Sequence, residues 1–397
     1  MSYSVQNIRN VCLVGHSGNG KTALAESLLF MTGAINRMGN SADGNTVCDY
    51  DPEEIRRQIS ISTAVAPIEY NGCKINVLDT PGYFDFVGEV IEAVQVADAA
   101  IIVCSAKAGM SVGAEKAWKL CQQRKLPRLL YISKTDEENS DYNATFNALR
   151  ESVRGVEWKV VGSEIARLRE IKDEDELALI RQACRITGEA FERILPHIKE
   201  GVTEKELALR LDFDMMSHGA SKPSFSTIVA AGANGSLPHA VPGEYRLRRG
   251  DMITMDFGAR YGNYCADMTR TVALGQPSDE MKKVYGIVLD AQKMAQDAVA
   301  AGKLCRDIDA IARNYIYSHG YEGRFGHGLG HSVGIDIHED PRFNQVSTAV
   351  LKAGQVMTVE PGIYLPGVGG VRIENSVVVR EGGCEVLTFP DRELIIP

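Results

Sequence analysis

Residues 247–258 read Leu-Arg-Arg-Gly-Asp-Met-Ile-Thr-Met-Asp-Phe-Gly, and residues 351–362 follow the same pattern as Leu-Lys-Ala-Gly-Gln-Val-Met-Thr-Val-Glu-Pro-Gly. Two further segments match at a similar offset, Gly201 with Ser217-His-Gly and Gly302 with Ser318-His-Gly. Chance similarity between glycine-bounded strands could explain either match alone, but two matches in the same order indicate an internal repeat. Each copy reads as a helix, a turn, a strand and an acid, which predicts two related α+β lobes facing each other across a pseudo-twofold axis.

Each predicted lobe contributes two carboxylates, Asp256 and Asp267 in the first and Glu360 and Glu374 in the second. A turn between the two acids of a lobe, at Tyr261–Asn263 in the first and at Pro366–Gly370 in the second, lets both side chains point to one face of antiparallel strands. Four carboxylates on one sheet repel one another unless cations neutralise them, so the crowding predicts a metal site. With His331 added, the donors suit Mn²⁺, Co²⁺ or Zn²⁺. Two such ions about 3.5–4 Å apart would activate a shared water, which is the chemistry of hydrolysis.

Several segments give the second half of the chain a family resemblance: Met255-Asp-Phe-Gly, Ala266-Asp-Met-Thr-Arg, Gly326-His-Gly-Leu-Gly-His, Val359-Glu-Pro-Gly-Ile-Tyr and Val371-Arg-Ile-Glu-Asn. Residues 167–392 resemble the pita-bread metallopeptidases, which include methionine aminopeptidase, Xaa-Pro aminopeptidase, Xaa-Pro dipeptidase and creatinase. The resemblance implies five ligands for two metal ions, Asp256, Asp267, His331, Glu360 and Glu374. It also implies that Asp267 and Glu374 bridge the ions and that Glu360 accepts a proton. Creatinase lacks the metal set and is disfavoured.

The form of these motifs resembles the Xaa-Pro branch of the family. The features are the His-Gly-Leu-Gly-His segment, the 14-residue step from Glu360 to Glu374, and Arg372 beside Glu374. This resemblance implies hydrolysis of Xaa-Pro bonds at the N-termini of short proline-containing peptides or in dipeptides. Mn²⁺ is the first choice of metal, with Co²⁺ and Zn²⁺ as alternatives, and a homodimer is the expected assembly.

Three further histidines resemble catalytic residues of the family. His239 and His338 resemble its contacts to the substrate carbonyl and the transition state, and His327 resembles the extra histidine of the Xaa-Pro branch. A lone histidine is more often a packing or surface residue, and we keep that interpretation for His16, His197, His218 and His319. Arg372 is either a structural partner of a nearby acid or a group that orients a carboxylate and shapes the pocket, and both interpretations stay open.

The first 150 residues follow a different pattern, in which short apolar β-rich runs alternate with helical stretches. The runs are Val11–Gly15, Lys74–Leu78, Ala99–Cys104 and Leu129–Ile132, and the helical stretches include Thr22–Leu29, Val87–Val96 and Gly113–Gln123. This alternation predicts a parallel α/β sheet. Residues 15–22, Gly-His-Ser-Gly-Asn-Gly-Lys-Thr, match the eight-residue phosphate-loop pattern between a strand and a helix. In that pattern backbone N–H groups surround phosphates, while the lysine neutralises them and the threonine holds Mg²⁺. The expected nucleotide-binding residues are Gly15, Gly20, Lys21, Thr22, Asp79, Lys134 and Asp136.

Together with Asp79-Thr-Pro-Gly and Ser133-Lys-Thr-Asp, this loop makes residues 5–150 resemble the first part of the GTPase domain of an elongation factor G-like translational GTPase. The resemblance implies GTP bound with Mg²⁺. Two departures weaken it: Ser133 replaces an asparagine that braces the guanine pocket, and Tyr83 replaces the histidine that follows the Asp-Thr-Pro-Gly segment. The peptidase pattern also begins before the last strand and helix of that domain, which leaves a predicted open sheet edge.

The fold prediction is therefore an α/β P-loop GTPase-like N-terminal fragment with a parallel sheet, residues 1–154, joined to an α+β pita-bread metallopeptidase domain with a pseudo-twofold repeat, residues 155–397. The length of 397 residues allows two to three domains of about 150. Two competing hypotheses remain beside the peptidase: a GTP-binding regulatory or translation-associated protein, and a joined pair of sequences whose nucleotide half is inactive.

Composition limits the partners and the compartment. The net charge of −9 gives no general attraction to nucleic acid or anionic lipid. Nine scattered cysteines without a Cys-x-x-Cys pair indicate reduced thiols and a cytoplasmic protein. We expect no signal peptide and no membrane helix, because the N-terminal stretch lacks a basic segment followed by an apolar one.

Overall fold

The computed structural model describes residues 3–70, 72–138, 140–153, 156 and 161–397. It divides the chain into two compact units, Met1–Trp158 and Lys159–Pro397, which are called the N-terminal and C-terminal units below. The predicted boundary between residues 154 and 155 lies outside the described residues. Among the helices that are described, none is both long and apolar enough to cross a membrane.

The N-terminal unit is an α/β sheet with strand order β2-β3-β1-β4-β5. Strands β1, β3, β4 and β5 are parallel, as predicted, whereas β2 is antiparallel to β3 and was not predicted. The strands are β1 Ile8–Gly15, β2 Ala64–Tyr70, β3 Cys73–Asp79, β4 Ala99–Ser105 and β5 Arg128–Ser133. The helices are α1 Lys21–Met31, α2 Pro52–Arg57, α3 Val87–Val96, α4 Val112–Gln123 and α5 Tyr142–Ser152, with 3₁₀ turns η1 Val5–Asn7, η2 Ser41–Asp43 and η3 Phe84–Phe86.

Alternation of side chains along β1 places apolar groups on both faces of this sheet. Cys12 and Val14 pack with residues of α3 and α4, while Leu13 packs with residues of α1. Both faces are therefore covered, as a parallel sheet requires. Within the described part of the unit β5 pairs with β4 alone, and its Leu129 and Tyr131 are 36% and 41% exposed. The pairing of β5 on one side alone, among the described residues, matches the open edge that the sequence predicts.

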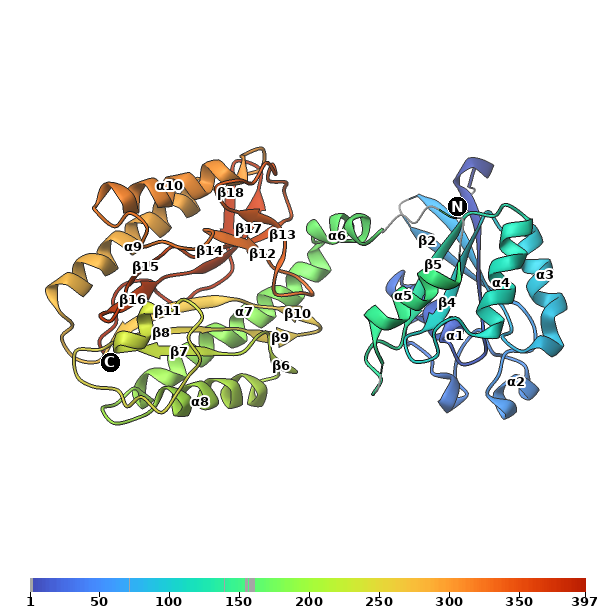
Figure 1. The fold of residues 1–397 in the computed structure, drawn as a ribbon, viewed down its shortest axis with the longest axis horizontal. Helices are drawn as coiled ribbons and strands as arrows, with labels where there is room; N and C mark the ends of the chain where they lie inside the picture. Colours follow the sequence, from blue (N-terminus) through green and yellow to red (C-terminus); the bar gives the residue numbers. More distant parts are fainter. Residues whose placement is uncertain (1–2, 71, 139, 154–155, 157–160) are drawn as a thin grey trace. The chain divides into compact units, whose positions relative to one another are not determined.

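The C-terminal unit contains two similar lobes, and each lobe corresponds to one copy of the sequence repeat (Figure 1). In the first lobe β7, β8 and β11 form an antiparallel sheet beside α7 and α8, and in the second β12, β14 and β17 form one beside α9 and α10. The helices are α6 Gly162–Glu170, α7 Glu174–Ile194, α8 Glu204–Ser217, α9 Asp279–Asp297 and α10 Cys305–Ser318, with η4 Leu195–His197 and η5 Gly232–Ser236. The strands are β6 Lys222–Pro223, β7 Ile228–Ala231, β8 Met252–Phe257, β9 Ala259–Tyr261, β10 Tyr264–Cys265, β11 Met268–Ala273, β12 Gly330–Ser332, β13 Glu339–Phe343, β14 Val356–Val359, β15 Gly362–Leu365, β16 Gly369–Arg372, β17 Asn375–Arg380 and β18 Gly383–Val386.

Helix α7 shows why these segments fold as they do. Asp173 and Glu176 form a capping box at its N-terminus. Its apolar side chains recur at helical spacing, and those of Leu177, Ile180 and Cys184 are fully buried in the core. Strands β8 and β11 are buried along their whole length, so the polar side chains that they contain need partners inside the unit, as the Thr254 and Thr271 hydroxyls do at 3.0 Å from each other.

Hydrogen bonds join the two lobes at the level of the predicted acids. The backbone N–H of Glu374 donates to the carbonyl of Thr269 at 3.1 Å. The hydroxyl of Ser376 donates to the carbonyl of Asp267 at 2.8 Å. Since each bond links the second lobe to β11 or to the residue before it, Glu374 is placed beside Asp267.

Candidate active site

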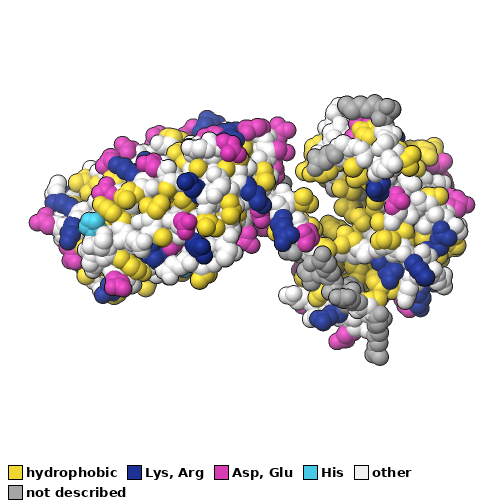
Figure 2. Space-filling model, turned by 90° about the horizontal axis from the view of Figure 1, so that it is seen from above, with side chains coloured by type: hydrophobic (Ala, Val, Ile, Leu, Met, Phe, Trp, Pro, Cys, Tyr) yellow, Lys and Arg dark blue, Asp and Glu magenta, His cyan; other side chains and the backbone are white. Residues whose placement is uncertain are grey.

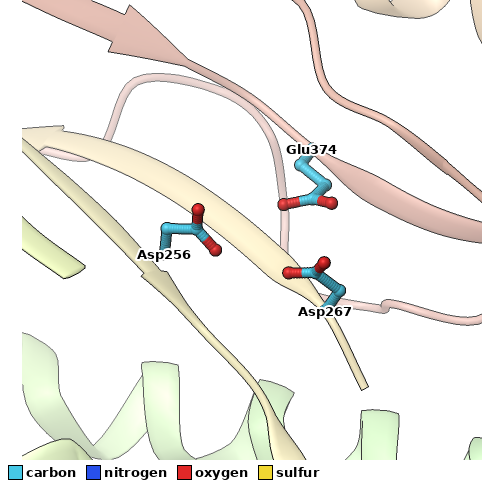
Figure 3. Close-up of side chains that lie close together, drawn as sticks. All are labelled: Asp256, Asp267 and Glu374. Carbon is cyan, nitrogen blue, oxygen red and sulfur yellow. The ribbon is translucent and has the colours of Figure 1, made fainter. Parts of the chain in front are cut away.

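Three carboxylates from both lobes converge in the C-terminal unit. Ligand oxygens of Asp256, Asp267 and Glu374 all lie within 4.8 Å of one another. Figure 3 shows the three side chains pointing toward a common space. Asp256 is part of β8, Asp267 lies between β10 and β11, and Glu374 lies between β16 and β17. The turns between each pair of acids fall at residues 262–263 and 366–368, within or beside the predicted positions.

His331 and Glu360 complete the cluster. The Nε2 atom of His331, on β12, lies 3.5 Å from Asp267 Oδ2 and 3.5 Å from Glu360 Oε1. Glu360 follows β14, and its Oε1 accepts a hydrogen bond from the Thr358 hydroxyl at 3.3 Å. The structure therefore brings together all five residues that the sequence predicts as metal ligands.

The electrostatics of the cluster reflect burial of several acids in one place. Burial raises the pKa of Glu360 to about 8. Burial, followed by the charges of neighbouring acids, raises the pKa values of Asp267 and Glu374 well above those of ordinary carboxyls. Burial lowers the pKa of His331 to about 4, so its imidazole is neutral at neutral pH and free to donate a lone pair.

Unpartnered oxygens show that the cluster fits cations. Asp256 Oδ1 and Glu374 Oε1 are buried and accept no hydrogen bond from any residue that the structure describes. A buried carboxylate oxygen without a partner costs free energy unless a cation or a proton satisfies it. Four carboxylates and one imidazole form a donor set for divalent metals that prefer oxygen and nitrogen ligands.

A hydrogen-bond chain runs from the cluster into the second lobe. Arg372 donates from NH2 to Asp256 Oδ2 at 2.6 Å and from NH1 to the Tyr364 hydroxyl oxygen at 2.9 Å. The same Tyr364 oxygen lies 2.8 Å from His327 Nε2. Arg372 is thus both a partner of a nearby acid and a wall of the cleft, so the two interpretations of this residue are compatible.

The predicted histidines line the same cavity as the acids. This cavity has a volume of about 380 Å³. Its lining includes His239, His327 and His338, together with Asp256, Asp267, His331, Glu360 and Arg372. The His338 ring lies edge-on to the His331 ring, with centroids 4.4 Å apart. Glu374 is placed below this lining and is 1% exposed.

Sequence reasoning missed several groups that support the site. Tyr364 lies within the quoted Val359-Glu-Pro-Gly-Ile-Tyr segment, yet its link between His327 and Arg372 depends on a contact across a hairpin. Thr269 donates to Glu374 Oε2 at 2.7 Å, and Phe225 and Ile228 form an apolar wall of the cavity. The polar threonines within otherwise apolar strands were the available signal, because a buried hydroxyl needs a partner.

Comparison with known proteins identifies this arrangement. The sequence model described as metallopeptidase family M24 matches residues 178–381, about half of the chain. The chain belongs to metallopeptidase family M24. The match includes all five cluster residues and lies entirely within the C-terminal unit.

Named M24-like relatives include an Xaa-Pro dipeptidase of Pyrococcus furiosus, which is 44% identical over 239 residues, or 60% of this chain and 69% of the relative. The solved prolidase from Pyrococcus horikoshii has a TM-score of 0.63 and 37% identity, and the likeness covers 71% of this chain and 85% of that one. The solved Xaa-Pro dipeptidase from Bacillus anthracis has a TM-score of 0.67 and 33% identity, covering 95% of this chain and 100% of that one. The pita-bread fold of the C-terminal unit is therefore that of the M24 family.

The phosphate-loop segment of this M24 chain lies outside the matched residues and forms a compact loop between β1 and α1. Gly20 has φ +88, and a Cβ at Gly15 would lie 2.4 Å from the carbonyl oxygen of Val103, so both positions require glycine. Lys21 is 6% exposed, and its Nζ donates to the His16 carbonyl within the loop at 3.0 Å. Burial lowers the pKa of Lys21.

Acidic and hydroxyl groups surround the start of α1. Asp79, at the end of β3, is 1% exposed, and neither carboxylate oxygen has a hydrogen-bond partner among the described residues. Burial raises its pKa to about 6. The Ser60 hydroxyl lies 3.3 Å from the Thr22 hydroxyl and donates to Asp49 Oδ1 at 2.7 Å.

The end of β5 contacts the loop through a hydroxyl, at the position where the GTPases that this segment resembles have an asparagine amide. The Ser133 hydroxyl donates to the carbonyl of Asn19 at 2.7 Å, so one brace between β5 and the phosphate loop is present. Lys134 has φ +58 and pairs with Glu137 at 2.8 Å, while Asp136 is exposed to solvent. Of the two nucleotide-binding residues predicted after β5, Lys134 is thus paired with an acid and Asp136 is exposed to solvent.

Proposed function

We propose that the C-terminal unit is a dinuclear metal-dependent peptidase that hydrolyses Xaa-Pro bonds in dipeptides or at the N-termini of short peptides. The observation that carries this proposal is the convergence of four carboxylates and one imidazole, with two buried oxygens that lack partners. Membership of the M24 family and relatives named Xaa-Pro dipeptidase support the same activity.

The metal ligands in this proposal are Asp256, Asp267, His331, Glu360 and Glu374, with Mn²⁺ as the first choice of ion and Co²⁺ or Zn²⁺ as alternatives. Two bound divalent cations would polarise the scissile carbonyl and lower the pKa of a water between them. Asp267 and Glu374 would each serve both ions, and their position at the contact between the lobes supports this role. Arg372 holds one oxygen of Asp256 and leaves the other free for a cation.

The remaining roles fall to residues that line the cavity. Glu360 accepts the proton of the attacking water, a role that its place in the cavity lining beside His331 supports. His239 and His338 contact the substrate carbonyl and the developing charge, and His327 forms a polar wall beside Tyr364. The apolar side chains of Phe225 and Ile228 provide a surface for a proline ring.

The test is release of proline from a Gly-Pro dipeptide and of the first residue from a Gly-Pro-Gly tripeptide. Metal-depleted protein should be inactive, and added Mn²⁺ should restore activity. Cleavage of the dipeptide alone would define a dipeptidase, whereas cleavage of the tripeptide would define an aminopeptidase. Absence of cleavage with all three metals would contradict the proposal.

A second candidate function belongs to the N-terminal unit, which is proposed to bind GTP with Mg²⁺ through Gly15, Gly20, Lys21, Thr22, Asp79, Lys134 and Asp136. The observation that favours it is the unpartnered, buried Asp79 carboxylate beside the start of α1. Such a carboxylate suits a hydrated cation, and the helix N-terminus suits a phosphate. Titration with labelled GTP tests it, since a nucleotide half that has lost function would bind none at micromolar concentration.

The assignment of residues 1–154 and 155–397 to two domains, assembly as a homodimer and a cytoplasmic location also remain proposals. All nine cysteines are unpaired in the structure, which supports a reducing compartment. Figure 2 shows basic and acidic side chains interspersed over the visible face of the C-terminal unit. That mixture gives nucleic acid no continuous basic patch on this face.

A further inference from the structure

Helix α10 contains an ion pair that the catalytic proposal does not use. Arg313 donates from Nε to Asp309 Oδ2 at 2.7 Å and from NH2 to Asp309 Oδ1 at 2.8 Å. Asp309 is 0% exposed and Arg313 6%. A buried ion pair gives little net stability compared with apolar side chains of the same volume, because both charges lose their hydration. Because stability alone does not explain the pair, its other contacts indicate its role.

Both members bind the backbone of the segment that carries His327. Arg313 donates from NH1 to the Phe325 carbonyl at 2.8 Å and from NH2 to the His327 carbonyl at 2.7 Å. Asp309 Oδ1 accepts from the Leu329 N–H at 3.0 Å. The guanidinium also lies 4.2 Å from the centre of the Phe325 ring. Three backbone groups within five residues are thus fixed to one rigid helix.

On its other side this segment is held by the burial of Phe325 and Leu329 in the apolar core and by a hydrogen bond from the Glu360 N–H to the Leu329 carbonyl at 2.8 Å. It lies between α10 and β12 and includes Gly326 and Gly328, which impose little conformational restriction of their own. The His327 ring faces the cavity at its far side, where Nε2 is 2.8 Å from the Tyr364 hydroxyl. The Phe325 ring packs edge-on against it with centroids 5.0 Å apart. Fixing the backbone on the α10 side therefore fixes the depth of the His327 ring in the cavity.

We infer that the Asp309–Arg313 pair is a positioning device that sets the place of His327 in the substrate cavity. Neither Asp309 nor Arg313 lines the cavity, and the pair acts through its contact with the backbone of His327, which does. This inference rests on the proposed peptidase function only for its kinetic readout. Arg is required because one planar guanidinium reaches Asp309 and two carbonyls at once, which an ammonium group cannot do.

The kinetic test is a double-mutant cycle of Arg313→Lys and His327→Ala on the full-length, Mn²⁺-loaded protein. Arg313→Lys is expected to raise KM for Gly-Pro by about tenfold, with Mn²⁺ content unchanged. In the His327→Ala background the same substitution should change KM less than about twofold, because its target is gone. Arg193→Lys is the control, since Arg193 forms a bidentate pair with Asp214 outside the cavity.

Two outcomes would overturn the inference: wild-type kinetics in Arg313→Lys, or effects of the two substitutions that simply add. Where Arg313→Lys does not fold, Asp309→Asn replaces it, because an amide oxygen still accepts from Leu329. A readout without activity is the NMR signal of the His327 ring, assigned by its loss in His327→Ala. That signal should shift in Arg313→Lys and not in Arg193→Lys. If wild-type protein cleaves no Xaa-Pro substrate, the function proposal fails while the NMR result still decides this one.

Discussion

At the scale of single residues, the acid cluster is held by contacts that leave specific oxygens free. Arg372 and Thr269 each satisfy one oxygen of a ligand carboxylate, and the other oxygen of that carboxylate has no partner among the described residues. The side chains are therefore oriented before any ion arrives. A preoriented site loses little conformational entropy on binding.

Asp267→Asn tests the bridging role at this scale. Replacing one oxygen donor with an amide removes a charge that both ions need, so we expect Mn²⁺ affinity and peptidase rate to fall by at least about 100-fold. Calorimetry and proline release would measure the two losses. Asp212→Asn is the control, because Asp212 is a partly buried acid of α8 that pairs with Thr227 outside the cluster. Full activity in Asp267→Asn would contradict the ligand assignment.

The raised carboxyl pKa values predict how stability depends on pH. Burial raises the pKa of Glu360 from an ordinary 4.5 to about 8. In this window the folded metal-free protein binds more protons than the unfolded chain, so its free energy of unfolding falls as the pH rises from about 5 to 8. Bound Mn²⁺ replaces the protons and should remove this dependence. Thermal melting across that range, with and without Mn²⁺, measures it; a flat curve for metal-free protein would contradict the prediction.

At the scale of helices and strands, hydrogen bonds join the residues directly after α6 to the second lobe. Lys172 follows α6 and is buried, and its Nζ donates to Glu339 Oε2 at 2.9 Å. Its backbone N–H donates to the carbonyl of Gly354 at 3.0 Å. Glu339 begins β13, directly after His338 in the chain, so this contact fixes the approach of His338 to the cavity.

Lys172→Met is expected to leave a buried carboxylate short of a partner and to lower the free energy of unfolding by about 3 kcal/mol. Lys352→Met is the comparison, since Lys352 forms an exposed pair with Glu170 and its loss should cost less than about 1 kcal/mol. Urea unfolding of Mn²⁺-loaded protein would measure both. Equal losses would show that the contact of Lys172 with Glu339 stabilises the fold no more than the contact of Lys352 with Glu170 does.

Periodicity and turn residues were enough to predict the longer elements. Helix α3 occupies the predicted residues Val87–Val96, and the four parallel strands lie within a few residues of their expected positions. The antiparallel strand β2 was missed because its burial alternates along a short segment that contains Pro67. The five residues that the structure brings together could be predicted from motifs, whereas the contacts of Tyr364 and Arg313 could not. Their roles depend on pairing between hairpins and on packing of α10, which sequence spacing does not reveal.

At the scale of the whole molecule, each of the two units has its own apolar core. The five proposed metal ligands all lie in the C-terminal unit, and the phosphate-loop motif lies in the N-terminal unit. Each of these two sets of residues therefore belongs to a single unit. We therefore expect a substitution in one unit to leave the activity of the other unit unchanged.

Lys21→Ala tests that division. We expect it to abolish GTP binding while peptidase activity with Mn²⁺ stays within about twofold of wild type. In wild-type protein, Mg²⁺ with GTP should raise the melting temperature more at pH 8 than at pH 5, because burial raises the pKa of Asp79 to about 6 and a protonated carboxyl holds Mg²⁺ poorly. Loss of peptidase activity in Lys21→Ala would show coupling between the units.

The internal repeat makes the C-terminal unit equivalent to a dimer within a single chain. The first lobe supplies Asp256 and Asp267, the second supplies His331, Glu360 and Glu374, and residues 274–278 connect the lobes between β11 and α9. Covalent linkage keeps the halves at an effective concentration in the millimolar range. If the chain were cut within this connection, each fragment would hold only part of the ligand set, and activity would become second order in fragment concentration. The connecting segment thus keeps all five residues together in one molecule at any protein concentration.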